Sequence, residues 1–184
     1  MGIQKERMLA GELYIADDPE LAADNRRAMV LMERFNATSA TDGETRRAIL
    51  AELLGHFGEG SEIRAPMYCD YGQYINIGSG TFINFGAMLI DVAPITIGHD
   101  CQLGPNVQLL TPLHPVDPGP RRDKWEAAKP ITLEDNVWLG GGVIVLPGVT
   151  IGQNTVVGAG SVVTKSLPAN VVAVGSPARV IREI

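Results

Sequence analysis

His114 stands where a histidine side chain could act as a base. It lies in the stretch Thr111–Pro115, five positions after the aliphatic repeat residue Leu109, and the repeat register directs its side chain outward. An imidazole with an ordinary pKa of about 6.5 takes up a proton around neutral pH. A hydroxyl is a poor nucleophile at that pH unless such a base removes its proton. An exposed histidine without a chemical role fits the same position equally well, so the residue alone leaves both interpretations open.

Composition narrows the class of protein. The chain has 184 residues and a formal net charge of −6, which argues against a general nucleic-acid binder and leaves room for a local basic patch around one small anion. Cys69 and Cys101 are the only cysteines, which fits a reducing compartment, and we expect a cytoplasmic protein. No apolar run approaches the ~20 residues of a membrane span, and the N-terminus lacks the apolar stretch of a signal peptide.

A six-residue repeat positions these residues. Its members are branched aliphatic or aromatic and fall into three runs: Tyr71, Ile77, Ile83 and Leu89; then, after a slip of two residues near Pro94, Ile97, Leu103 and Leu109; and finally Leu133, Leu139, Val145, Ile151, Val157 and Val163. Six matches neither the 3.6-residue period of a helix nor the two-residue alternation of a flat strand. Short strands separated by sharp turns do fit. The repeat therefore predicts stacked coils that pair in parallel and bury an aliphatic column.

Small and flexible residues mark the corners of these coils. Small or β-branched residues follow the step residues at a constant spacing, at Val137, Val143, Val149, Thr155 and Ser161. Glycine directly follows the step residue at Gly140, Gly152 and Gly158, where we expect turns that need a positive φ. Five prolines interrupt the repeat between residues 111 and 130, so this segment is expected to leave the coils as an exposed loop.

Residues 1–60 follow a helical pattern instead, and we expect them to form a separate N-terminal segment before a coil domain at 61–184. Asp18, Pro19 and Glu20 resemble an N-cap, a first helical position and an early acid. A second helix is predicted after Thr41 and Glu44, which fit a capping box. Two short helices with a polar link are the simplest account. They serve either as packing for the coils or as part of a substrate site.

Several strings resemble the maltose and galactoside O-acetyltransferase family of hexapeptide-repeat acyltransferases. They are Gly11–Tyr14, Cys69–Gly72, Thr111–Pro115, Asn136–Trp138, Pro147–Gly152, Ala159–Lys165 and Gly175–Arg179, and they span nearly the whole chain. The resemblance implies a left-handed triangular β-helix that assembles as a homotrimer, with active sites between neighbouring subunits. It also implies transfer of an acetyl group from acetyl-CoA to a sugar such as maltose, glucose or a galactoside, without a metal.

The same resemblance assigns roles to individual residues. His114 would be the general base, and Asn84 would hold the acceptor hydroxyl or stabilise the transition state. The backbone N–H of Gly141 would face the oxyanion, because tetrahedral intermediates need such donors. Ala159 and Thr164 would contact the pantetheine arm. Asp70, Asp17 and Asp91 match the acceptor side, where Asp91 would instead orient His114 or simply hold a turn. The cations that would meet the phosphates are Lys165, Arg179 and Arg182.

Other interpretations remain open at this point. Asn84, Gly141 and the basic residues could be ordinary turn or solvated tail residues. The departures from the family pattern, at Gly86, Ala87, Trp125 and Ala127, lie around the acceptor side, so the acceptor could instead be an antibiotic, an oligosaccharide or a serine. A zinc enzyme of the γ-carbonic-anhydrase type would need all three histidines, of which His56 falls in the segment expected to be helical. A non-catalytic scaffold is the remaining alternative.

Overall fold

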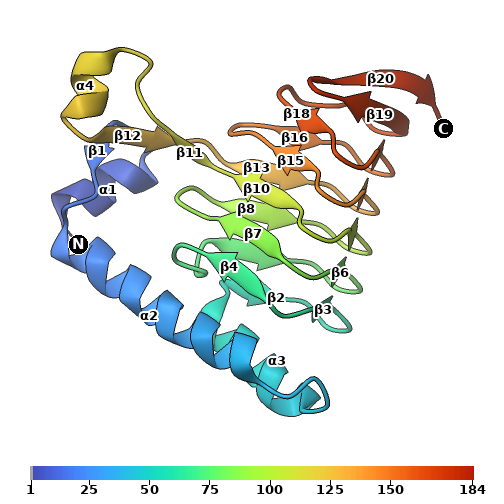
Figure 1. Ribbon diagram of the computed structural model, residues 1–184, viewed down its shortest axis with the longest axis horizontal. Coiled ribbons are helices and arrows are strands. Elements are labelled where there is room, and N and C mark those ends of the chain that lie inside the picture. The colour runs from blue at the N-terminus through green and yellow to red at the C-terminus, as the bar shows by residue number, and fades with distance from the viewer. Residues whose placement is uncertain (1) are drawn as a thin grey trace.

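The computed structural model describes residues 2–184 and is a left-handed parallel β-helix with a helical N-terminal segment (Figure 1). Each coil contributes one short strand to each of three parallel sheets, so the stack has three faces and three edges. The coil fold expected from the repeat is confirmed. Among residues 2–184, no helix is long and apolar enough to cross a bilayer.

The three sheets are built as follows. Sheet I holds β2 (His56–Phe57), β5 (Ile75–Ile77), β8 (Ile95–Ile97), β13 (Ile131–Leu133) and β16 (Thr150–Ile151). Sheet II holds β3 (Glu62–Ile63), β6 (Phe82–Ile83), β9 (Gln102–Leu103), β14 (Trp138–Leu139), β17 (Val156–Val157), β19 (Val171–Gly175) and β20 (Ala178–Glu183). Sheet III holds β4 (Met67–Cys69), β7 (Ala87–Ile90), β10 (Gln108–Leu110), β15 (Ile144–Val145) and β18 (Val162–Val163).

The step residues form the buried column that the sequence predicts. Leu133, Leu139 and Val145 are fully buried, as are the later members of that run, and the small residues Val137 and Val143 point inward with them. These side chains belong to one continuous core that extends to α2 and α3. Tyr71 is the exception, because it is buried in a second, smaller cluster against the N-terminal segment.

The glycines that follow step residues are needed for a different reason from the one expected. Gly140, Gly152 and Gly158 do not have a positive φ. A Cβ on Gly140 would lie 2.5 Å from the backbone nitrogen of Ala159 in the next coil, and one on Gly152 would lie 2.4 Å from that of Ala169. These positions exclude a side chain because adjacent coils stack so closely there.

The N-terminal segment contains three helices rather than two: α1 (Ile3–Leu9), α2 (Pro19–Ala37) and α3 (Gly43–Leu53). Asp18 caps α2 by accepting the N–H of Glu20 at 2.9 Å, as its position in the sequence predicts. The cap of α3 is Asp42, which accepts the N–H of Thr45, so the expected capping box from Thr41 was wrong by one residue. His56 is not helical. It begins β2, so the coils start before the expected boundary at residue 61.

Side chains of α2 and α3 bond to the backbone of the first coil. The Asn36 amide accepts the N–H of Met67 and donates to its C=O, both at 3.0 Å, as a neighbouring strand would. Arg46 donates to the C=O of Ile63 at 3.0 Å, and Arg47 donates to the C=O of Gly58 at 3.1 Å. The two helices therefore provide hydrogen-bond partners that a preceding coil would otherwise supply.

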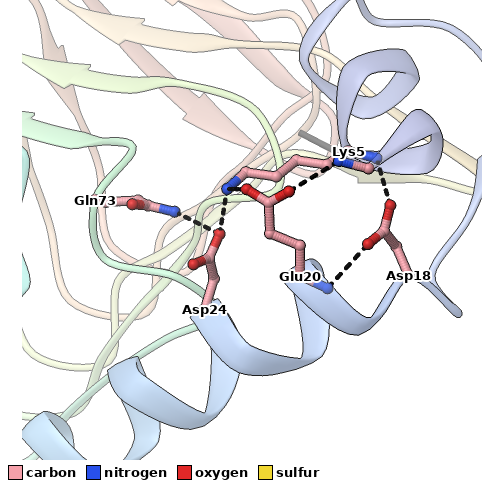
Figure 2. Close-up of polar contacts among 6 residues, drawn as sticks. Lys5, Asp18, Glu20, Asp24 and Gln73 are labelled. Carbon is pink, nitrogen blue, oxygen red and sulfur yellow. Dashed lines mark hydrogen bonds and ion pairs between the residues drawn. The ribbon is translucent and has the colours of Figure 1, made fainter.

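Lys5 fixes the chain start to α2 (Figure 2). Its ammonium nitrogen lies 2.7 Å from Glu20 Oε1 and 2.6 Å from Asp24 Oδ2, and Gln73 of the coil domain donates to the same Asp24 oxygen at 3.1 Å. These contacts raise the pKa of the Lys5 ammonium, and the hydrogen bond to Asp24 has the largest effect. The network connects α1, α2 and the coils, and so fixes the strand that follows α1.

The proline-rich segment leaves the coils as expected, and it is ordered. It forms β11 (Pro112–Leu113), α4 (Pro118–Arg122) and β12 (Trp125–Ala128). Strand β12 pairs antiparallel with β11 and also with β1 (Tyr14–Ile15), which gives a small sheet between the loop and the N-terminal segment. The guanidinium of Arg7 in α1 lies 5.2 Å from the centre of the Trp125 ring, which adds a second contact between the N-terminal segment and the loop.

Candidate active site

Two edges of the prism carry most of the expected site residues, and both border sheet III. The histidine edge consists of the turns that follow sheet III strands and holds Asp70, Asp91, His114, Thr164 and Lys165. The glycine edge consists of the turns that join sheet II to sheet III and holds Asn84, Gly141 and Ala159.

His114 directly follows β11 on the histidine edge and is exposed. Strand pairing places Leu113 opposite Ala127, so the next register position sets His114 across from Glu126. On the other side of β12, Glu126 pairs with Tyr14. Residues directly opposite one another in antiparallel strands share a face of the sheet. Tyr14, Glu126 and His114 therefore form a row across the small sheet.

Glu126 is the acidic neighbour of His114. Partial burial raises the pKa of Glu126, whereas the charge of His114 and a hydrogen bond from the Tyr14 hydroxyl lower it, and Asp70 adds to the rise. Tyr14 is almost completely buried, and its own pKa is raised by burial and then by Glu126. Glu126 could not be identified from the sequence, because its position depends on the pairing of β12 with β1.

Asp70 lies on the same edge directly after β4 and is half-buried, and desolvation raises the pKa of its carboxyl. Among residues 2–184, no hydrogen bond or ion pair reaches its carboxylate. Its backbone is held firmly: its C=O accepts the Asn25 amide at 2.9 Å, and its N–H donates to Asp91. Asp70 is therefore a fixed carboxylate whose oxygens are available to a ligand.

Asp91 does not fit the acceptor-binding role expected for it. Its side chain is fully buried and accepts the backbone N–H groups of Asp70, Tyr71 and Tyr74 at 3.0, 2.9 and 3.2 Å. Burial raises its pKa to about 6, although these hydrogen bonds act in the opposite direction. The second expectation, that Asp91 orients His114, finds no contact among the described residues. Asp91 instead holds the turn that presents Asp70.

A pocket of about 370 Å³ opens between the N-terminal segment and the histidine edge. Its lining residues come from β1, α2, β12 and the turns of two coils: Tyr14, Ala16, Leu21, Ala22, Asn25, Asp70, Tyr71, Val92 and Glu126. Asp17 is exposed between β1 and α2, next to lining residue Ala16, and does not itself line the pocket. The helical segment thus contributes a wall to a pocket beside His114.

The glycine edge presents backbone groups. Gly141 lacks a positive φ, and a Cβ there would lie 3.4 Å from Pro105, close to ordinary contact. The turn itself therefore does not require glycine, and no hydrogen bond from the Gly141 N–H is found among residues 2–184. Ala159 lies exposed in the next coil, where the N–H of Gly160 donates to the C=O of Gly141 at 2.9 Å. Asn84 uses its side-chain oxygen to accept the N–H of Phe85 at 2.9 Å.

The three cations expected to meet phosphates are all exposed at the C-terminal end of the stack. Lys165 follows β18 on the histidine edge. Arg179 and Arg182 lie in β20, where Arg179 pairs with Val174 and Arg182 pairs with Val172. Val174 contacts Gly158 beside Ala159, so Arg179 extends the line of the glycine edge.

One chain does not bring Asn84 and His114 together. The two edges lie on opposite sides of sheet III. At about 3.3 Å per residue along a strand, the distance between them is roughly 15–20 Å. A reacting hydroxyl contacts its catalytic groups at about 2.6–3.2 Å. Asn84 and His114 can therefore act on the same hydroxyl only if the glycine edge of a second molecule approaches the histidine edge of the first.

The histidines do not converge. His56 and His99 line an open groove of about 590 Å³ on the outer side of sheet I, whereas His114 lies on the histidine edge. Across residues 2–184, no group of three or more His, Cys, Asp or Glu side chains is placed to hold a metal ion. The groove is larger than the pocket beside His114, but it contains none of the expected site residues.

Comparisons with known proteins agree with this architecture. Residues 7–58 match the maltose acetyltransferase hexapeptide capping motif, and residues 130–165 match the bacterial transferase hexapeptide repeats. The chain is 43% identical to a galactoside O-acetyltransferase of Lactococcus lactis over 97% of this chain and 87% of that relative.

Solved structures give the same result. A maltose O-acetyltransferase from Clostridium difficile 630 superposes with a TM-score of 0.97 at 44% identity, covering 98% of this chain and 97% of that one. A hexapeptide-repeat acetyltransferase of Vibrio cholerae, solved in complex with acetyl-CoA, has a TM-score of 0.92 at 39% identity, with 100% and 98% coverage. With the helical cap, the repeats and the full-length identity all in agreement, the chain belongs to the maltose and galactoside O-acetyltransferase family.

Proposed function

We propose that this protein transfers the acetyl group of acetyl-CoA to a hydroxyl of a sugar, with His114 as the general base. The observation that carries the proposal is the position of His114 beside a pocket lined by two aromatic rings and two carboxylates. Aromatic rings and carboxylates suit the apolar faces and the hydroxyls of a sugar. The Vibrio cholerae relative, solved with acetyl-CoA, supports the choice of donor.

The transfer step follows from these groups. The acceptor hydroxyl oxygen attacks the thioester carbon while its proton passes to the His114 imidazole, and the carbonyl oxygen becomes an oxyanion. We assign the unpaired N–H of Gly141 as the donor to that oxyanion. Removal of one such donor typically lowers turnover by ~10²–10³-fold. Collapse of the intermediate breaks the carbon–sulfur bond, and the coenzyme A thiolate takes the proton from His114. The products are an acetyl ester and free coenzyme A.

The coenzyme is expected to lie along the two edges that border sheet III. Gly141 and Ala159, two and three coils beyond Asn84 on the glycine edge, would offer backbone groups to the pantetheine arm. Thr164 lies at the level of Ala159 on the other edge. The phosphates would then reach Lys165, Arg179 and Arg182, whose exposed positive charges suit an anion.

A trimer would join these edges. The outward residues of sheet III form a column in direct register that is apolar except for one glutamine: Tyr68, Met88, Gln108, Ile144 and Val162. Tyr68 and Met88 are neighbours in this column and are 44% and 40% exposed, and adjacent exposed apolar side chains are typical of an interaction surface. The outward column of sheet I is polar by contrast: His56, Asn76, Thr96, Thr132 and Thr150. If sheet III faces a threefold axis, the histidine edge of each subunit meets the glycine edge of its neighbour.

A panel of acceptors with acetyl-CoA tests the proposed function. Free thiol release would be followed with maltose, glucose, a galactoside, chloramphenicol and serine, and the products identified by mass spectrometry. We expect acetyl esters with sugars only. Activity confined to serine or chloramphenicol, or no thiol release with any acceptor, would contradict the proposal.

A further inference from the structure

We infer that the preferred acceptor is an amino sugar, whose ammonium group binds Asp70 and Glu126 while a neighbouring hydroxyl faces His114. This inference rests on the proposed function, and it specifies the substrate class within it. The observation behind it is that both charged residues lining the acceptor pocket are acids.

The two carboxylates reach the pocket from different parts of the fold. Asp70 is presented by a coil turn whose backbone is fixed by Asp91 and Asn25. Glu126 comes from the extruded loop and pairs with Tyr14 in the small sheet. Each of the two carboxylates raises the pKa of a shared neighbour, Tyr14, and Asp70 also raises that of Glu126, so they lie within electrostatic reach of one another.

Neither carboxylate is neutralised by a basic side chain of the pocket wall. Lys5, the nearest lysine in the network beside α2, already binds Glu20 and Asp24. Arg7 lies over the outer Trp125 ring and 3.7 Å from Glu12. Among residues 2–184, His114 is the one basic group whose charge affects Glu126, and it must be neutral before it can accept a proton.

This arrangement favours a cation over a neutral ligand. Desolvation raises the pKa of both Asp70 and Glu126, which means that their ionised forms are disfavoured in the empty pocket. A hydroxyl can donate a hydrogen bond to a carboxylate but leaves the negative charge in place. An ammonium group donates up to three hydrogen bonds and also neutralises charge, and hydrogen bonds to charged groups are the stronger kind.

The reaction remains an O-acetylation. The ammonium group, with its nitrogen protonated, has no lone pair for attack on the thioester. The hydroxyl oxygen beside it forms the new bond to the acetyl carbon, its proton goes to His114, and the coenzyme A thiolate leaves with that proton. The product is an O-acetyl amino sugar.

Three matched sugars test the inference: glucosamine, glucose and N-acetylglucosamine, which differ only at carbon 2. We expect kcat/KM for glucosamine to exceed both others by roughly 10- to 100-fold, the range for a hydrogen bond to a charged group. In Glu126→Gln and in Asp70→Asn, this preference should fall to within a few-fold, because kcat/KM for glucosamine falls much more than kcat/KM for glucose, while the KM for acetyl-CoA changes little. Asp123→Asn, on the same loop but outside the pocket, is the matched control and should keep the wild-type preference.

The outcomes separate the two proposals. If glucose is acetylated as well as glucosamine, or if the preference survives in both variants, the inference is wrong while the proposed function stands. An N-acetylated product, identified by NMR, would also overturn it, because the nitrogen would then lie at the thioester. Absence of thiol release with every sugar would instead contradict the proposed function. Thermal unfolding of each variant establishes that the folded protein is being compared.

Discussion

The buried carboxylate of Asp91 accepts the backbone N–H of Asp70 at 3.0 Å. A fully buried residue of one coil thus fixes the turn of the preceding coil, and that turn carries an available carboxylate into the acceptor pocket. The same Asp91 oxygen also accepts the N–H of Tyr71 at 2.9 Å, so the aromatic wall and the acid of the pocket share one support.

Asp91→Asn should change how stability depends on pH. Burial raises the pKa of Asp91 from its ordinary 3.8 to about 6. As pH rises from about 4 to about 6, the unfolded chain loses this proton before the folded protein does, so the free energy of unfolding falls over that window. Above a pH of about 6, both states have lost this proton, and the Asp91 contribution to the free energy of unfolding no longer changes with pH. The amide of the variant does not titrate, so its decline across the window should be shallower. Denaturant unfolding at several pH values measures this, and parallel curves for the two proteins would contradict it.

His114→Ala should lower turnover by ~10²–10⁴-fold, the usual effect of losing a general base. Binding of acetyl-CoA and the mass of the assembly should not change, because the side chain is exposed and supports no other element. His56→Ala is the matched control, since His56 is also exposed but lies on sheet I. Steady-state kinetics and calorimetric titration of acetyl-CoA separate the effects. Turnover close to wild type in His114→Ala would remove this residue from the mechanism.

Removing Lys165 and Arg179 together should raise the KM for acetyl-CoA far more than that for the sugar. With a net charge of −6 the protein as a whole repels an anion, so local cations must offset that repulsion. Both side chains are exposed, and salt screens their effect over roughly 8–10 Å. The double alanine variant should therefore also show a weaker dependence of cofactor binding on salt. Saturation curves at two salt concentrations measure both effects. A change confined to the sugar KM would place the cofactor elsewhere.

Met88→Glu should dissociate the assembly. It sets a charge between Tyr68 and Gln108 in the outward, mainly apolar column of sheet III, where the wild-type side chain is 40% exposed in a single chain. Thr96→Glu adds the same charge in the neighbouring polar column of sheet I and serves as the control. Light scattering should give about three times the 19.7 kDa of one chain for the wild type and the control, and one chain for Met88→Glu. A wild-type protein that is fully active as a monomer would contradict an active site formed between neighbouring subunits.

The sequence predicted the coils well because their physical requirement is local and repeated. Every sixth position from Leu133 to Val163 must fill the same narrow interior, and all six of these residues are fully buried. The helix N-cap at Asp18 could also be predicted, because an N-cap depends only on residues that are neighbours in the sequence. The positive φ expected at Gly140 was wrong, because contact with the next coil, not the turn conformation, excludes a side chain there.

The pocket was harder to predict because it depends on contacts between distant segments. Glu126 reaches the pocket only when β12 pairs with β1, and no local pattern marks that pairing. Asp91 has a residue type that suits an acceptor site, but its burial and its three backbone partners are visible only in the fold. The roles expected for Asn84, Gly141 and the basic residues stay predictions until the variants are made.

The bonds from Asn36, Arg46 and Arg47 to the first coil have a consequence for self-association. A stack of parallel coils exposes unpaired backbone groups at its ends, which could template strands of another molecule and grow into a fibre. Here the helical segment occupies those groups at one end. At the other end, β20 pairs antiparallel with β19 and so covers the last strand of sheet II. The segment that forms a wall of the acceptor pocket thereby also occupies backbone groups with which a further coil could otherwise pair.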